Sequence, residues 1–394
     1  MSPKTHPWGV PPWTVDFRPT ALPLPDQVDF AIVGGGFTGL STAAWLAKLA
    51  PKKSALVLEA STLGEGASGR TGGLALAETA AGPLPGLGDV LGGYKKILRG
   101  LAIDARLELP GVYELGRSNP ARDSPICWND SGNLQVVRTV PGGAVDPGKV
   151  VDGLARAAQQ AGAHIGEHAE VQTIEYLNPL RLQVRRKVRG RMEKKEVRAG
   201  QILLATNAFS LDLAGFDLAA QPKLTLALAT APLSSAQLKA LGLCSRRPFY
   251  TVDLPYLWGR LLDSNGIVFG AGLVPMRSSI ASLFTKPGKS ARPLAAPNLY
   301  RFNVRKGESA EGFRWLESRV HRLHPALKSI RITHRWAGPV LFTEGMRPIF
   351  RRHPRSKNVL VLAGYNGHGV ALAVYLGRWA AEALLGCRSL PVWR

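Results

Sequence analysis

The sequence predicts an α/β fold in which a Rossmann-type dinucleotide-binding domain is interleaved with an antiparallel-sheet domain. Residues 30–33 are fully apolar, as in a strand buried in a parallel sheet, and a glycine-rich turn and an Ala- and Leu-rich helix follow them. Residues 359–385 repeat this order of strand, glycine-rich turn and helix. Residues 221–330 contain alternating segments such as 223–229, which predict antiparallel strands.

The first glycine-rich turn has the spacing of a dinucleotide-binding motif. Gly34, Gly36 and Gly39 form G-x-G-x-x-G. The first glycine permits a tight turn, the second lets a pyrophosphate approach the backbone, and the third lets the helix lie close on the sheet. A second apolar strand, residues 55–58, ends in Glu59, whose carboxylate suits a ribose hydroxyl. These parts in this order predict a bound dinucleotide; the alternative is a glycine-rich turn without a ligand.

Length and composition restrict the class of protein. The 394 residues suffice for two domains that share one interface. No run of 18 apolar residues occurs, so we expect no membrane span, and the polar start of the chain predicts no secretory signal. Cys127, Cys244 and Cys387 lie far apart without a C-x-x-C motif, which predicts isolated thiols in a cytoplasmic protein.

The chain is strongly basic. Lys and Arg number 50 against 28 Asp and Glu, for a formal net charge of +22. Much of the excess falls in residues 181–198, where a basic run around Gly190 predicts a β-hairpin with one solvated face. Aromatic residues do not interleave with these charges, as stacking on nucleic acid would require, so we do not expect a nucleic-acid partner. The positive field favours anionic ligands.

Composition also divides the chain into parts. Residues 1–28 are rich in Pro and Trp and predict an extended N-terminal arm over the surface. The segment 64–73 is too glycine-rich for regular structure, which indicates backbone pressed against a flat ligand. We assign the cofactor-binding domain to residues 29–88, 145–220 and 331–394, and the substrate domain to residues 89–144 and 221–330.

Four separated segments together carry a family resemblance. They are the G-x-G-x-x-G unit, Gly-Ala-Ser-Gly-Arg-Thr-Gly-Gly at 66–73, Leu-Ala-Thr-Asn-Ala at 204–208 and Gly-Tyr-Asn-Gly-His-Gly-Val at 364–370. In this combination the chain resembles the flavin-dependent amine and D-amino-acid oxidase family, in particular its γ-glutamylputrescine-oxidase-like branch. That branch has Asn where this chain has Thr71. The resemblance covers nearly the whole chain.

The resemblance implies FAD as the cofactor. The ADP half would contact Gly34, Gly36, Phe37, Thr38, Gly39, Glu59, Ala60 and Val171, the segment 204–208 would contribute Ala205 and Asn207, and the isoalloxazine would lie beside Ser68, Arg70, Thr71, Gly72, Gly367, His368, Gly369 and Val370. A helix N-terminus after His368 would stabilise the negative charge of reduced flavin. The alternative is that His368 caps its own helix. Relatives with covalent flavin use a Cys near 336–338 or a His near the first turn, and neither occurs here, which predicts non-covalent binding.

The same resemblance implies the chemistry. In the family a hydride passes from the carbon beside an amine nitrogen to flavin N5. The candidates for catalysis are Arg70, Asp253, Tyr256, Trp258 and His368, with Tyr250 as a further pocket residue. Aromatic walls and one carboxylate suit a protonated amine. The alternative is that alternate residues of 249–258 belong to the core.

Two departures from the family pattern concern substrate and acceptor. Amino-acid oxidases of the family bind the substrate carboxylate with an Arg in Gly-Leu-Arg-Pro, and here Val340 takes that place, which disfavours a simple α-amino acid. Arg347 or Arg301 are possible substitutes. Members that react readily with oxygen carry a Lys near the flavin, where this chain has Val268. The electron acceptor, oxygen or another compound, therefore stays open.

We interpret the sequence as an FAD-dependent oxidoreductase that oxidises the C–N bond of a small-molecule amine or amino-acid derivative. A first alternative is a flavin dehydrogenase that passes electrons to a quinone or a protein carrier. A second is a non-catalytic flavin-binding scaffold associated with RNA. Bleaching of the flavin by an amine, and recovery of the colour in air, distinguishes the three.

Overall fold

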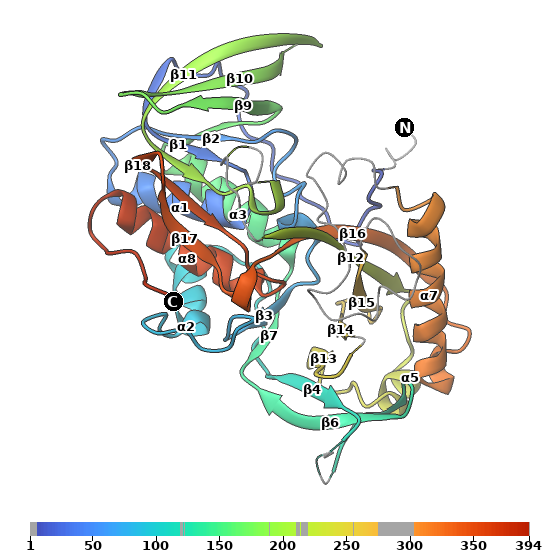
Figure 1. Ribbon diagram of the computed structural model, residues 1–394. Helices are drawn as coiled ribbons and strands as arrows, with labels where there is room; N and C mark the ends of the chain where they lie inside the picture. Colours follow the sequence, from blue (N-terminus) through green and yellow to red (C-terminus); the bar gives the residue numbers. More distant parts are fainter. Residues whose placement is uncertain are drawn as a thin grey trace.

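The computed structural model describes residues 6–118, 121, 123–188, 190–209, 213, 220–254, 256–274 and 303–393. Within them the chain forms two eight-stranded sheets and a small two-stranded sheet, β3 (Leu74–Leu76) with β7 (Gly142–Ala144). Figure 1 shows the small sheet between the two large ones.

The first large sheet is built on parallel strands. Its strands are β1 (Gln27–Val33), β2 (Ala55–Leu58), β8 (His164–Gly166), β9 (Ala169–Glu175), β10 (Leu180–Val188), β11 (Arg191–Leu204), β17 (Ile349–His353) and β18 (Ser356–Ala363). The order is β17-β18-β11-β1-β2-β8, with β17 antiparallel and the other neighbours parallel. β10 and β9 extend the sheet from β11 by antiparallel pairing.

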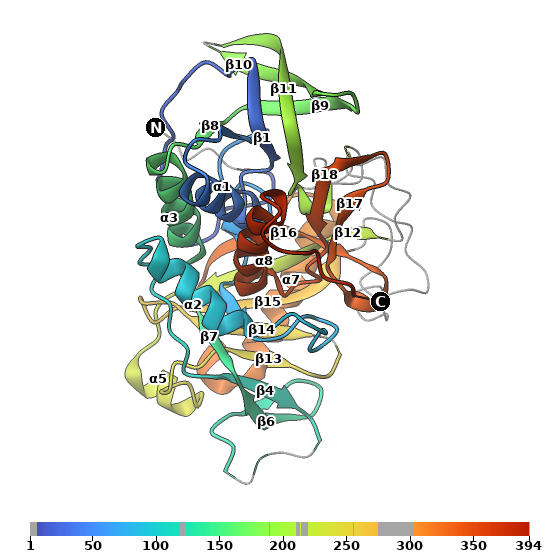
Figure 2. The same ribbon diagram turned by 90° about the vertical axis from the view of Figure 1, so that its left-hand side faces the viewer.

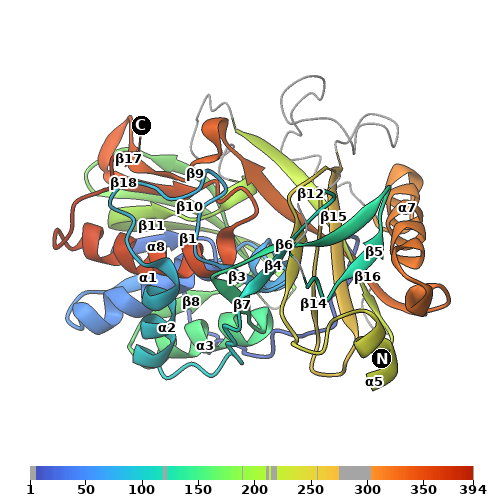
Figure 3. The ribbon, with the colours of Figure 1, turned by 90° about the horizontal axis from the view of Figure 1, so that it is seen from below.

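The two faces of this sheet are covered differently, and both are buried. Its helices are α1 (Phe37–Leu49), α2 (Val90–Gly100), α3 (Pro147–Gln160) and α8 (Gly369–Leu384). On one face Ile32 and Val57 pack into a layer in which α1 contacts α3 and α8, and α2 contacts α8 (Figure 3). On the other face Ala31 and Val33 pack against the strands β9, β10 and β11, which project together in Figure 2. Burial on both faces explains why β1 is apolar throughout.

The second large sheet is antiparallel except for the pair β4–β13. Its order is β16-β12-β15-β14-β13-β4-β6-β5, formed by β4 (Val112–Gly116), β5 (Cys127–Asn129), β6 (Asn133–Val140), β12 (Gln221–Thr230), β13 (Phe249–Thr251), β14 (Leu257–Leu261), β15 (Ile267–Val274) and β16 (Ile332–Phe342). Helices α7 (Gly307–Leu323) and α5 (Ser235–Ala240) lie at its outer side (Figure 1). Leu224, Leu226 and Leu228 of β12 share a core cluster with Phe313 and Leu316 of α7. The intervening residues of β12 therefore face the first sheet.

The predicted α/β fold with an antiparallel second sheet is confirmed. The domain bounds stay a prediction. Two elements belong to the other sheet than those bounds imply: β16 is a strand of the second sheet, and α2 packs with α8 over the first sheet. The apolar stripe of a helix shows that it is half-buried, but not which sheet it covers. Among the described helices, none has both the length and the apolar character that a membrane crossing needs.

Two buried indoles anchor the N-terminal arm. Trp8 and Trp13 are buried, and Gly9 forms a bridge to Trp336 at the edge of β16. The indole N–H of Trp13 donates to the carbonyl of Gly69 at 2.8 Å. The two large indoles lose most of their water contact in this position and hold the arm in place, while residues 20–23 of the arm stay exposed.

A buried ionic cluster connects α7 to the loop before β14. The guanidinium of Arg319 donates to both carboxylate oxygens of Asp130, at 2.9 and 2.6 Å, and to the carbonyl of Tyr256 at 3.1 Å. Arg117 also pairs with Asp130, at 2.8 Å. Both Arg319 and Asp130 are buried. Arg319 thus fixes the helix to the loop before β14, and the carboxylate of Asp130 holds its guanidinium in place.

We expect Asp130→Ala to lower the free energy of unfolding by about 3–5 kcal/mol, because it leaves the buried charge of Arg319 without its carboxylate. Urea unfolding followed by far-UV circular dichroism measures the change. Asp26→Ala is the control, since Asp26 pairs with Lys195 on the surface, and its effect should be several-fold smaller. Equal losses in the two variants would contradict the proposed role of the cluster.

Candidate functional site

A cavity of about 1190 Å³ lies between the two large sheets. Its wall includes the glycine turn after β1, the segment 64–74, the strands β12 and β16, and the N-terminus of α8. A single drug-sized ligand occupies roughly 300–1,000 Å³. The cavity therefore has room for a large ligand and a small molecule beside it.

The glycine turn places backbone at the cavity wall. Gly34 has φ 112°, and a Cβ there would lie 2.7 Å from the carbonyl oxygen of Ala205. A Cβ at Gly39 would lie 2.0 Å from the carbonyl oxygen of Gly34, so Gly39 serves helix packing and does not line the cavity. Gly36 precedes α1, and the hydroxyl of Ser68 accepts from the backbone N–H of Phe37 in the first turn of this helix at 2.9 Å. The helix N-terminus thus faces the cavity with the positive end of its dipole.

Glu59 lies at the end of β2 beside this turn. Its carboxylate accepts from the backbone N–H groups of Gly35 and Ser61, both at 2.8 Å. Burial raises the pKa of Glu59, and these two donors oppose the rise. The two hydrogen bonds fix the carboxylate at the wall, where it can accept from a ligand hydroxyl.

The segment 64–73 is held from behind by buried donors. Its carbonyl at Gly69 accepts from Trp13, its carbonyl at Arg70 accepts from the indole of Trp336 at 2.9 Å, and its carbonyl at Gly72 accepts from Arg260 at 2.5 Å. Burial lowers the pKa of Arg260 to about 10, so it stays charged at neutral pH. These three bonds come from the arm, β16 and β14 and fix the course of the segment along the cavity.

Arg70 joins this segment to the arm. Its guanidinium donates to the carbonyl of Gly9 at 2.8 Å and pairs with Glu65 at 3.1 Å. It also lies over the ring of Trp8, 5.5 Å from the centroid. Burial alone would raise the pKa of Glu65, but the hydrogen bond from His6 and the charge of Arg70 hold it at about 2. Arg70 lines the cavity, and its donors are engaged by the protein itself.

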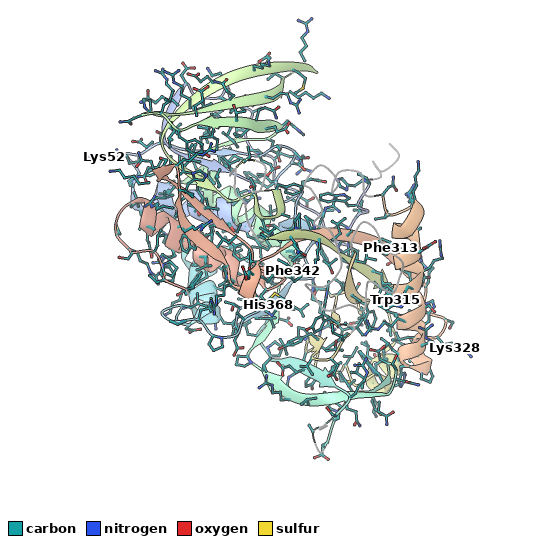
Figure 4. The ribbon with its side chains drawn as sticks, viewed as in Figure 1. Lys52, Phe313, Trp315, Lys328, Phe342 and His368 are labelled. Atoms are coloured by element: carbon teal, nitrogen blue, oxygen red, sulfur yellow. The ribbon has the colours of Figure 1, made fainter. Side chains whose placement is uncertain are left out.

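The second glycine turn brings another helix N-terminus to the cavity. Gly367, His368, Gly369 and Val370 line it, and α8 begins at Gly369. The imidazole of His368 makes no capping hydrogen bond to this helix, and burial lowers its pKa. Figure 4 shows His368 close to Phe342 of β16 at the centre of the molecule, and both line the same cavity. The open amides of α8 therefore face the ligand space.

Aromatic side chains of the second sheet form the opposite wall. Tyr250, Tyr256 and Trp258 line the cavity, and the hydroxyl of Tyr250 donates to Glu114. The indole of Trp258 lies between two glycines, because a Cβ at Gly72 or Gly270 would meet it at 2.1 or 1.9 Å.

The structure brings most of the predicted site residues together. Of the cofactor candidates it brings all except Gly39 to the cavity, namely Gly34, Gly36, Phe37, Thr38, Glu59, Ala60, Ser68, Arg70, Thr71, Gly72, Val171, Ala205, Asn207, Gly367, His368, Gly369 and Val370. Of the catalytic candidates, Asp253 is not among the lining residues. Its carboxylate accepts from the backbone N–H of Arg117 at 2.9 Å.

The sequence also singled out Arg347, Arg301 and Val268. Arg347 is exposed and does not line the cavity, and Arg301 lies outside the described residues. Val268 is fully buried in a cluster with Trp13 and Trp336, and it does not itself line the cavity.

Except for Val340, sequence reasoning missed one wall of the cavity. Alternate residues of β12 and β16 line the cavity: Gln221, Lys223, Thr225, Ala227, Trp336, Gly338, Val340 and Phe342. The alternation in 223–229 was sufficient to predict a strand but not which of its faces meets the ligand. Trp8 was also missed, since the only signal for it was the density of indoles in the arm.

Comparison with known proteins agrees with this architecture. The model of the family described as FAD dependent oxidoreductase matches residues 29–126 and 129–383. γ-Glutamylputrescine oxidoreductase of Escherichia coli K12 is 26% identical over 404 aligned positions, covering 91% of this chain and 84% of that protein. Glycine oxidase of Bacillus licheniformis is 24% identical, covering 93% and 95%. Both span nearly the whole chain.

Solved structures show the same fold. Glycine oxidase from Geobacillus kaustophilus superposes with a TM-score of 0.66 at 19% identity, covering 93% of this chain and 96% of that one. L-proline dehydrogenase from P. horikoshii gives 0.65 at 19% identity, covering 93% and 95%.

The cavity fits FAD, which this family typically binds non-covalently. It combines two helix N-termini for negative charge with a carboxylate for a hydroxyl and a glycine-rich wall that admits a flat ring. Cys127, Cys244 and Cys387 are free and exposed, and none lines the cavity.

We expect Gly36→Asp to be purified without FAD. The new side chain would meet Ser68 Oγ, 2.7 Å from its Cβ, and would bring a negative charge to the wall where the phosphates bind. Flavin absorbance per protein measures occupancy. Gly190→Asp, in an exposed hairpin turn with open space around its Cβ, should retain the cofactor. A Gly36→Asp variant with stoichiometric FAD would contradict the assignment.

Acid precipitation of the purified protein should release the yellow colour into the supernatant as FAD, because no cysteine reaches the cavity. Chromatography of the supernatant identifies the flavin. Colour that stays with the precipitated chain, or release of FMN, would count against non-covalent FAD.

Proposed function

The chain belongs to the family of FAD-dependent oxidoreductases, and we propose that it oxidises the C–N bond of an amine or amino-acid derivative. The observation that carries this proposal is the continuity of one cavity from the glycine turn of the first sheet to the aromatic wall of the second. The similar proteins γ-glutamylputrescine oxidoreductase and glycine oxidase, whose names refer to nitrogen-bearing compounds, support the substrate class.

Different residues of the chain bind different parts of the cofactor and the substrate. We assign the phosphates to the N-terminus of α1, the ribose to Glu59 and the adenine to Val171. Bound FAD supplies an acceptor that takes a hydride at N5. The amides at the N-terminus of α8 stabilise the negative charge of the reduced ring, and Tyr256 and Trp258 hold the protonated amine by cation–π attraction.

The cavity wall disfavours an α-amino acid bound in the manner of the family. Val340 lines the cavity at the position of the family's carboxylate-binding Arg. An aliphatic side chain offers no donor to a carboxylate, whereas an Arg would offer a bidentate pair.

The second candidate is a dehydrogenase with an acceptor other than oxygen. The sequence carries Val268 where members that react readily with oxygen have a Lys, and this buried aliphatic residue brings no charge to the cavity, which favours a dehydrogenase. Nucleic-acid binding has less support, since part of the basic hairpin is neutralised by the pairs Arg185–Glu170 and Lys195–Asp26. The three exposed, unpaired thiols support a cytoplasmic location.

We expect anaerobic mixing with amines to bleach the flavin. D-alanine and glycine should react poorly, because Val340 offers no hydrogen-bond donor to their carboxylates. Stopped-flow absorbance measures the rates, and admission of air then tests the acceptor. Colour that returns in air indicates an oxidase, and colour that returns only with a quinone indicates a dehydrogenase. Rapid bleaching by D-alanine would overturn the proposed substrate class.

A further inference from the structure

We propose that Lys223 binds an anionic group of the substrate, so that the substrate is an amine with a carboxylate several carbons from the oxidised C–N bond. This inference rests on the proposed function and specifies its substrate class. The observations that carry it are the register of β12 and β16 and the lack of a carboxylate partner for Lys223.

Register places Lys223 directly opposite Val340. The two residues are paired in the antiparallel ladder of β12 and β16, and both line the cavity. Side chains at directly opposed positions lie on the same face, with Cβ atoms about 4.5–5.5 Å apart. The wall that lacks an Arg on β16 thus has a cation on the neighbouring strand.

The charge of Lys223 is unmatched in the described part of the chain. Two Arg side chains also line the cavity, and both have carboxylate partners. Arg70 pairs with Glu65, and Arg185 pairs with Glu170. For Lys223 no carboxylate lies within ion-pair distance among the described residues, and its contact is the ring of Phe342, 5.2 Å from Nζ. Burial lowers the pKa of Lys223. A half-buried ammonium of this kind gains most from an anionic ligand.

The position of the ammonium sets where the anion lies. Phe342 is two residues beyond Val340 on β16, one side-chain row or about 7 Å along the strand. The ammonium is therefore displaced from the Val340 row, where the family's Arg would hold an α-carboxylate, and a carboxylate that it binds lies about one row from that position. Gln221, opposite Phe342 and on the same face of β12, adds an amide donor beside it.

Pairs of compounds that differ only in the carboxylate test this inference. The pairs are 5-aminopentanoate with pentylamine, and 4-aminobutanoate with butylamine, each mixed anaerobically with the holoenzyme. In the wild type, the apparent Kd from flavin bleaching should be lower for the amino acid of each pair. In Lys223→Met it should rise by roughly 10- to 100-fold for the amino acids and by less than about twofold for the alkylamines.

Two control variants separate charge from folding. Lys223→Arg keeps the charge and should retain the preference for the carboxylate. Lys328→Met removes an exposed lysine at the far side of the second sheet, remote from Phe342 and His368 (Figure 4), and should behave as wild type. FAD content should be the same in all variants. A Lys223→Met variant that loses FAD would overturn the inference and assign Lys223 to the cofactor.

Binding of pentanoate provides a readout that does not depend on turnover. Titration of the oxidised holoenzyme, followed by the shift in flavin absorbance, should give a Kd at least tenfold higher in Lys223→Met than in the wild type. Equal pentanoate binding in both, or equal effects on both members of each pair, would overturn the role of Lys223 while amine oxidation stands. If no amine bleaches the flavin, the proposed function fails, and the pentanoate titration still decides the role of Lys223.

Discussion

The backbone of residues 69–72 is the constraint on which the site depends. Three of its carbonyls accept from Trp13, Trp336 and Arg260, which belong to parts of the chain far apart in sequence. A peptide group whose carbonyl oxygen accepts a hydrogen bond from the surrounding protein turns its opposite side toward the cavity. The glycine-rich segment needs no regular structure of its own, because the arm and the second sheet hold it in place.

The two helix N-termini at the cavity are also held at a fixed separation. α1 and α8 pack on each other, and the hydroxyls of Ser41 and Thr42 donate to carbonyls of α8 at 2.8 Å. The hydroxyl of Thr38 lies 2.5 Å from that of Tyr365 in the second glycine turn. The distance between the two anion-binding ends is therefore a property of the packed core, and one extended ligand can engage both.

Local motifs made much of this site predictable. The residues around Gly36 and His368 are recognisable because each turn joins a strand to a helix, and Glu59 is recognisable because it ends the next apolar strand, in a spacing that only a few functions require. Lys223 and Trp8 were not predictable, because their roles depend on strand register and on which face of a sheet meets another. Asp253 shows the opposite case: a carboxylate in an aromatic segment suited an amine, but the backbone of Arg117 binds it.

The close packing of Trp258 between Gly72 and Gly270 restricts how the sequence can change. Gly72 lies in the glycine-rich segment before β3 and Gly270 lies in β15, and neither admits even a methyl group while the indole is present. A smaller residue at 258 would have to come first, and either glycine could then vary. Among related proteins residues 72, 258 and 270 should therefore change together. Where a tryptophan stands at 258, glycine should stand at both 72 and 270, and a smaller residue at 258 should permit larger residues there.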